Sequence, residues 1–207
     1  MTLKIGYFQP VIMFTDTVPP VEFSKIFNLV DKLHMQPELD ISLESTSLRG
    51  GQQIQVYPNK LEIDVAWLVK WLESVCVAYM EMVNQQSLAE DLKYCKPVIT
   101  NVWTIQQHAG DYQEMHTHPG GNISGNIYIS APEFEDKQSS DGQLLFRLPQ
   151  TRDVSKFIMA DTWKYDPEPG TYVVFPSYIP HTVYPWKGMG PRTVLSFDAK
   201  LIPKDEI

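Results

Sequence analysis

Two histidines separated by one residue are the first feature of this sequence that suggests chemistry. His116 and His118 close a segment, residues 112–118, that is predicted to be a β-strand. Side chains two positions apart in a strand share a face and lie about 6.6 Å apart, so both imidazoles can reach one metal ion. Glu114 lies on the same face by the same count. The glycine-rich turn Pro119-Gly120-Gly121 follows, and we interpret the histidine pair as candidate metal ligands.

A third histidine, His181, opens another predicted strand after the turn-forming sequence Phe-Pro-Ser-Tyr-Ile-Pro. A jelly roll brings distant strands together at the mouth of its barrel, where His181 can complete a facial triad with His116 and His118. Such a triad leaves three positions of an octahedral iron open for a bidentate ligand and O2. The competing interpretation is an exposed histidine in a proline-rich turn.

Arg192 is one of only four arginines in the chain and follows His181 by eleven residues. Residues 186–191 predict a hairpin turn, which would place the two side chains at opposite ends of neighbouring strands, roughly 13 Å apart. A five-carbon dicarboxylate that chelates iron at one end would fill that gap. A guanidinium suits its far end because it binds a carboxylate bidentately and keeps its charge. Arg147, in another predicted strand, is the second candidate for this role.

Short strands must position these residues. After residue 97 the chain contains seven segments rich in β-branched and aromatic residues, separated by glycine and proline turns, without helical patterns between them. This arrangement predicts an antiparallel sandwich or jelly roll. The segments are 98–107, 112–118, 123–130, 143–148, 171–175, 181–185 and 192–201.

The first half of the chain has a different pattern. Residues 4–15 predict one or two short strands, and Pro19-Pro20 predicts the start of a helix. Residues 36–60 are polar and irregular, which is typical either of a lid or of a solvated connector. Residues 61–93 predict a long amphipathic helix that packs on the outside of a sheet. We therefore expect one domain over 1–207, in which 1–96 packs on a catalytic jelly roll formed by 97–201.

Composition excludes several classes of protein. A net charge of −8 argues against nucleic acid as a partner, and no run of 18 apolar residues predicts a membrane span. The N-terminus lacks the pattern of a signal peptide, and the two cysteines form no C-x-x-C motif. Cys76 falls in an apolar helical pattern, where a buried inert thiol is expected. We expect a cytoplasmic protein without a membrane or nucleic-acid partner.

Read together, these residues resemble a known family, the Fe(II)/2-oxoglutarate-dependent oxygenases with an H-x-H-P…S-G-x-x-Y signature, on the prolyl-4-hydroxylase-like branch. The resemblance covers about residues 97–201. It implies that His116 and His181 bind iron, that Arg192 pairs with the distal carboxylate of 2-oxoglutarate, and that Tyr128 donates a hydrogen bond to that carboxylate. The motif residues are Trp103, Gly110-Asp111, His116-Thr117-His118-Pro119, Ser124-Gly125-Asn126-Ile127-Tyr128, Gly142, Phe175-Pro176-Ser177, His181 and Arg192.

One position departs from the wider superfamily, which has H-x-D where this chain has His116-Thr117-His118. His118, Glu114 or a water molecule can fill the place of the aspartate, and a three-histidine site would lack one negative charge. The resemblance implies a dioxygenase that uses Fe(II), O2 and 2-oxoglutarate, which it decarboxylates to succinate, to hydroxylate a peptide side chain or a small molecule. The alternatives are a cupin-like three-histidine metal enzyme that does not use 2-oxoglutarate and a non-catalytic jelly-roll binding module.

Overall fold

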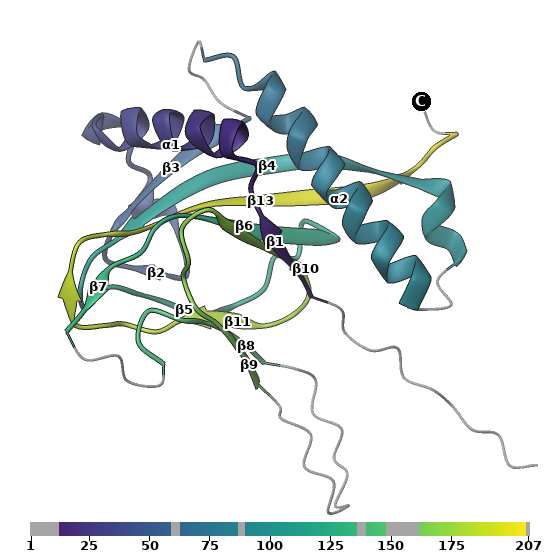
Figure 1. Cartoon of the computed structure of the whole chain (residues 1–207). Coiled ribbons are helices and arrows are strands. Elements are labelled where there is room, and N and C mark those ends of the chain that lie inside the picture. Colours follow the sequence, from purple (N-terminus) through teal and green to yellow (C-terminus); the bar gives the residue numbers. More distant parts are fainter. Residues whose placement is uncertain (1–12, 59–62, 87–89, 136–139, 148–161, 206–207) are drawn as a thin grey trace, which may run out of the picture.

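Two antiparallel sheets face each other, and two helices cover the outer face of the larger sheet (Figure 1). This arrangement is seen in a computed structural model that describes residues 13–58, 63–86, 90–135, 140–147 and 162–205. The apolar side chains form two clusters, one between the larger sheet and the helices and one between the two sheets. The candidate site residues lie in the second layer, between the two sheets.

In the described residues the larger sheet has six strands, in the order β1 (Phe14–Thr17), β10 (Thr171–Pro176), β6 (Ile123–Ser130), β13 (Arg192–Pro203), β4 (Cys95–Gln107) and β3 (Gln52–Tyr57). The smaller sheet has the order β2 (Leu48–Arg49), β5 (Tyr112–His116), β11 (His181–Val183), β8 (Leu144–Arg147) and β9 (Thr162–Tyr165). From β4 to β13 the chain passes repeatedly between the two sheets, as in a double-stranded β-helix, with β8 and β9 consecutive in the smaller sheet. The predicted jelly roll with flanking helices is confirmed, and each of the seven predicted segments contains a strand.

The prediction that residues 36–60 form an irregular lid or connector was wrong for the described residues 36–58. After two short 3-10 helices, η1 (Pro37–Leu39) and η2 (Ser42–Glu44), this region supplies β2 and β3, an edge strand of each sheet. The missed signal is the sequence Gln-Gln-Ile-Gln-Val-Tyr of β3, in which Ile54 and Val56 alternate with polar residues and are buried. Alternation of this kind is typical of a strand with one buried face.

The predicted hairpin between His181 and Arg192 was also wrong. His181 begins β11 in the smaller sheet, whereas Arg192 begins β13 in the larger sheet, so the two strands do not pair. Within the connection, β12 (Gly188–Met189) pairs with β7 (Glu133–Phe134), and the chain then crosses to the other sheet. The two side chains consequently face each other across the barrel interior instead of along one hairpin.

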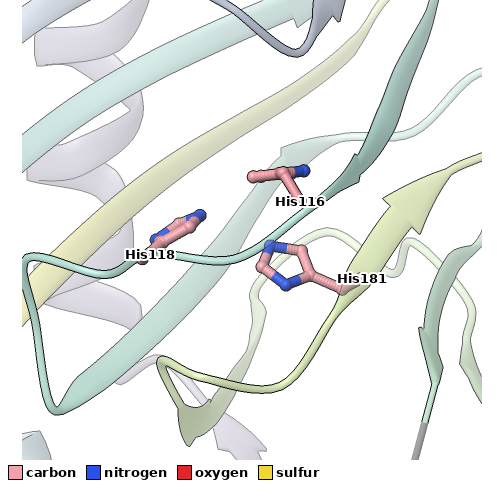
Figure 2. Close-up of side chains that lie close together, drawn as sticks. All are labelled: His116, His118 and His181. Carbon is pink, nitrogen blue, oxygen red and sulfur yellow. The ribbon is translucent and has the colours of Figure 1, made fainter.

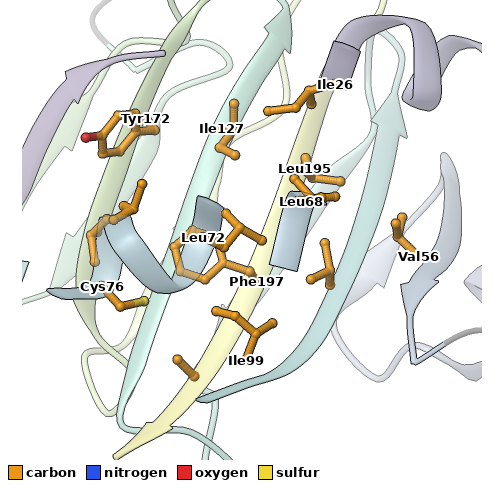
Figure 3. Close-up of a cluster of buried hydrophobic side chains, with 14 of the residues drawn as sticks. Ile26, Val56, Leu68, Leu72, Cys76, Ile99, Ile127, Tyr172, Leu195 and Phe197 are labelled. Carbon is orange, nitrogen blue, oxygen red and sulfur yellow. The ribbon is translucent and has the colours of Figure 1, made fainter. Parts of the chain in front are cut away.

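Both predicted helices are present. Helix α1 (Pro20–His34) begins at the proline pair, and α2 (Ala66–Gln86) is shorter than predicted, followed by the 3-10 helix η3 (Glu90–Tyr94). Figure 3 shows Leu68, Leu72 and Cys76 of α2 over the larger sheet, and burial raises the pKa of the Cys76 thiol to about 12. In the described part of the chain no helix is both long and apolar enough to cross a bilayer. Most of the predicted 4–15 strand region lies outside the described residues.

Gly125 of the S-G-x-x-Y motif has a packing reason to be glycine. A methyl group there would collide with the ring of Phe197 and come within 2.9 Å of the carbonyl oxygen of Val173. We expect Gly125→Ala to lower the free energy of unfolding by about 1–3 kcal/mol, the usual cost of overpacking a core. Chemical denaturation checks this value. Gly120→Ala is the matched control, because nothing lies within 4 Å of its added methyl, and it should cost much less.

Candidate metal and cosubstrate site

Three histidines converge at one end of the space between the sheets (Figure 2). One nitrogen from each of His116, His118 and His181 lies within 4.8 Å of the others. The ring centroids of His116 and His181 are 4.3 Å apart, and His118 lies 5.0 Å from His181. The cross-strand pairing of β5 with β11 places His116 directly opposite His181, while His118 lies two residues beyond the end of β5.

Glu114 is excluded from this cluster by an irregularity in β5. Between the pairs His181–His116 and Val183–Gln113, β11 advances by two residues and β5 by three, so β5 contains a bulge. The bulge changes the alternation of side chains, and the cavity is lined by Gln113 and His116. Glu114 instead forms an ion pair with Arg49 at 3.0 Å. The prediction that Glu114 shares a face with His116 was therefore wrong.

The hydrogen bonds of the three histidines leave the same nitrogen of each ring available. The Nδ1 of His116 donates to the carbonyl oxygen of Glu114 at 2.7 Å, and that of His181 to the carbonyl oxygen of Ile179 at 2.9 Å. The Nδ1 of His118 donates to a carboxylate oxygen of Asp198 at 2.7 Å. Since oxygen acceptors require a proton on Nδ1, each Nε2 carries a free lone pair.

Burial keeps two of these rings neutral. It lowers the pKa of His116 and lowers the pKa of His181 well below its ordinary value, and in both cases neighbouring histidines lower it further. Neutral imidazoles with free Nε2 atoms are suitable ligands for a divalent transition metal. Phe175 and Phe146 pack against His181, with ring centroids 4.9 and 5.8 Å away, and restrict the access of water on that side.

Arg192 lies deeper in the same cavity and is only 1% exposed. Its Nη1 donates to Oε1 of Gln107 at 3.1 Å, and its guanidinium lies 5.3 Å from the centre of the Tyr128 ring. Among the described residues, four buried polar atoms lack a hydrogen-bond partner here: Nε and Nη2 of Arg192, the Tyr128 hydroxyl and Nε2 of Gln107. Burial lowers the pKa of Arg192 and raises that of Tyr128 to about 12, so the hydroxyl stays protonated.

These unpartnered donors indicate a missing acceptor. Buried donors are nearly always hydrogen-bonded, so a group of them around one guanidinium fits a bound anion such as a carboxylate. Arg147, the second candidate, is the exposed residue of β8 and is not among those that line the cavity. The structure thus brings Arg192 and Tyr128 together, as the resemblance implied, and adds Gln107.

Residues of β13 line the cavity from one end to the other. Arg192, Val194 and Ser196 alternate along the strand and face the interior, and Asp198 is the next residue in the same alternation. Of these four residues, only Arg192 was predicted to belong to the site. The signal for the others was the two-residue period that begins at Arg192, because it predicts that Ser196 and Asp198 share the face of the arginine.

Comparisons with known proteins agree with this architecture. Residues 101–198, just under half of the chain, match the family model described as "Putative 2OG-Fe(II) oxygenase". No sequence among the curated proteins matches this chain significantly.

Several solved structures are similar in fold. A Pseudomonas putida prolyl-4-hydroxylase is 16% identical with a TM-score of 0.58, over 91% of this chain and 92% of that one. A prolyl hydroxylase from Trichoplax adhaerens, in complex with a hypoxia inducible factor peptide fragment, is 15% identical with a TM-score of 0.58, over 92% and 83%. The viral collagen prolyl hydroxylase of Paramecium Bursaria Chlorella virus-1, in complex with 2OG, is 14% identical with a TM-score of 0.53, over 90% and 94%. Residues 101–198 of this chain thus resemble the putative 2OG-Fe(II) oxygenase family, and the chain shares its fold with these prolyl hydroxylases.

Proposed function

We propose that this protein is an Fe(II)/2-oxoglutarate-dependent dioxygenase whose iron is held by His116, His118 and His181. The observation that carries the proposal is the presence, in one cavity, of three available imidazole nitrogens and a buried guanidinium whose Nε and Nη2 lack partners among the described residues. The first group fits a transition metal and the second fits the distal carboxylate of the cosubstrate. A five-carbon dicarboxylate bound between the histidines and Arg192 would engage both groups.

The metal ligands are supported by the donor set. Three neutral imidazoles are typical ligands of first-row transition metals, and each ring is oriented by a hydrogen bond on its other nitrogen. Three protein ligands leave the remaining positions of an octahedral ion open for a bidentate 2-oxo acid and for O2. The ligand that replaces the usual aspartate is then His118.

The cosubstrate site is supported by chemistry and by length. Arg192 and the level of the histidines lie at opposite ends of the interior face of β13, and Arg192 to Asp198 spans about 20 Å of strand. A guanidinium, a five-carbon dicarboxylate, a metal ion and an imidazole placed end to end cover a span of that order. Tyr128 and Gln107 would then donate to the same carboxylate as Arg192.

In this proposal each residue has a defined task. Arg192, Tyr128 and Gln107 bind and orient the distal carboxylate, so that the 2-oxo acid end is directed toward the histidines. Phe146 and Phe175 keep water away from the reacting end. When bound, iron with O2 supplies the oxidising chemistry, in which 2-oxoglutarate is decarboxylated to succinate and the substrate is hydroxylated.

The substrate that we propose is a peptide side chain or a small molecule. This substrate class is supported by the fold, since the similar structures include prolyl hydroxylases, one of them bound to a peptide fragment. A cupin-like three-histidine enzyme is a poorer fit, because it gives no role to the buried Arg192. A non-catalytic module is a poorer fit for the same reason, since an unmatched buried charge costs several kcal/mol.

Succinate release tests the proposal. Purified protein supplied with Fe(II), O2 and 2-oxoglutarate should form succinate, detected by mass spectrometry, even without its own substrate. 2-Oxobutyrate, which lacks the distal carboxylate, should be consumed at least about 30-fold more slowly, corresponding to a loss of about 2 kcal/mol of binding. Equal consumption of the two acids, or succinate formation that does not depend on iron, would contradict the proposal.

A further inference from the structure

Asp198 is a buried carboxylate on the wall of the proposed metal site. It is 7% exposed and lies on β13 directly opposite Ser124 of β6. Its Oδ1 accepts hydrogen bonds from Nδ1 of His118 at 2.7 Å and from the Ser124 hydroxyl at 2.6 Å. Asp198 is not among the motif residues that carry the family resemblance, and the resemblance implied no role for it.

Among the described residues, no lysine or arginine balances the charge of Asp198. Among the ion pairs of the described residues, Asp198 is joined to His118, and neither a lysine nor an arginine pairs with it. A buried carboxylate without a lysine or arginine beside it is costly, and the hydrogen bonds from the His118 ring and the Ser124 hydroxyl offset only part of that cost. A divalent cation on the opposite nitrogen of His118 would balance the charge.

The proposed metal site, in turn, lacks a negatively charged ligand. Three neutral histidines bring no negative charge to a divalent ion, whereas a histidine-carboxylate set brings one. A carboxylate that accepts the Nδ1 proton of a metal-binding histidine fixes its tautomer and strengthens its Nε2 as a ligand. His118 is the one histidine of the three that has such a carboxylate, because carbonyl oxygens hold His116 and His181.

We infer that Asp198 supplies the negative charge of the metal site from the outer coordination sphere, acting through His118. This inference rests on the proposed function. Asp198 is a positioning residue and not a ligand, since a metal on Nε2 lies across the imidazole ring from it. Ser124 holds the carboxylate in place, and its own distance to Nδ1 of His118 is 3.2 Å. The H-x-H motif and Asp198 together would thus replace the usual H-x-D motif.

The variant Asp198→Asn tests the charge of this side chain while keeping its size and shape. The amide oxygen of asparagine can accept the same two hydrogen bonds, with Ser124 still donating to it, while the negative charge is lost. We expect the Kd for Fe(II), measured anaerobically by titration calorimetry without cosubstrate, to rise about 10–100-fold. The thermal unfolding midpoint of the metal-free protein should stay within a few degrees of the wild-type value. Asp16→Asn is the matched control, because it removes the same charge from an exposed strand.

Substitution with cobalt gives an independent readout. The visible ligand-field bands of Co(II) bound to Asp198→Asn should differ from those of the wild type, because the His118 ligand is a weaker donor. Unchanged Fe(II) affinity in Asp198→Asn, with identical Co(II) bands, would overturn the inference. His181→Ala measured in parallel distinguishes the two failures. If that variant binds Fe(II) as tightly as the wild type, the proposed metal site itself is wrong, whereas weakened binding there and normal binding in Asp198→Asn would refute only the role of Asp198.

Discussion

Arg192→Leu is expected to raise the Kd for 2-oxoglutarate by roughly 30-fold or more, with the affinity for iron unchanged. The reason is that the buried guanidinium is proposed to supply the charge-assisted hydrogen bonds to the distal carboxylate, and removing one partner of such a pair costs about 2–5 kcal/mol. Titration calorimetry of 2-oxoglutarate into the anaerobic Fe(II) protein measures the change.

Arg192→Leu should weaken 2-oxoglutarate binding without lowering the stability of the cosubstrate-free protein. In the free protein Arg192 is 1% exposed, and Nε and Nη2 lack partners among the described residues. Leucine removes an uncompensated charge, so the cosubstrate-free variant should be at least as stable as the wild type in thermal unfolding. Arg147→Leu is the matched control, because that arginine is exposed and outside the cavity. Normal 2-oxoglutarate affinity in Arg192→Leu would remove the proposed anchor.

His181→Ala is expected to abolish stoichiometric iron binding. It removes one of three proposed ligands, the one that is most deeply buried, and we expect the Kd for Fe(II) to rise by more than the 10–100-fold typical of an outer-sphere change. Anaerobic titration followed by metal analysis measures the loss.

Two further variants make this result specific. His181→Gln retains more of the side-chain volume between Phe146 and Phe175 and should lose iron in the same way, which separates ligand loss from a packing defect. His108→Ala alters an exposed histidine outside the cluster and should bind iron normally. Iron retained at one equivalent per chain in both His181 variants would mean that His181 is not a ligand.

Much of the architecture was predictable because turn residues and β-branched segments are local signals. The seven strand segments after residue 97 and the helix at Pro19-Pro20 follow from those signals. The edge strand β3 of the larger sheet was missed because its three glutamines conceal the alternation of Ile54 and Val56. A strand at the edge of a sheet carries more polar residues than one in the middle, so composition is a weaker guide there.

The candidate site was predictable to a different degree. The order of His116, His118, His181 and Arg192 indicated the chemistry, but strand counting failed at Glu114, because the β5 bulge depends on pairing with the distant strand β11. The hairpin to Arg192 failed for a related reason. Whether two consecutive strands pair or cross between sheets is decided by long-range packing, and here the two-residue pairing of β12 with β7 accompanies the crossing.

In the proposed site, one cavity binds Fe(II) through three histidines and 2-oxoglutarate through Arg192 at the same time. Anaerobic absorption spectroscopy tests this directly, because a 2-oxo acid that chelates Fe(II) gives a weak metal-to-ligand charge-transfer band in the visible. We predict that this band appears only when both Fe(II) and 2-oxoglutarate are added to the wild-type protein, and that it is absent in His181→Ala. A protein that binds Fe(II) but shows no such band with saturating 2-oxoglutarate, or a band of equal strength in His181→Ala, would contradict this mode of binding.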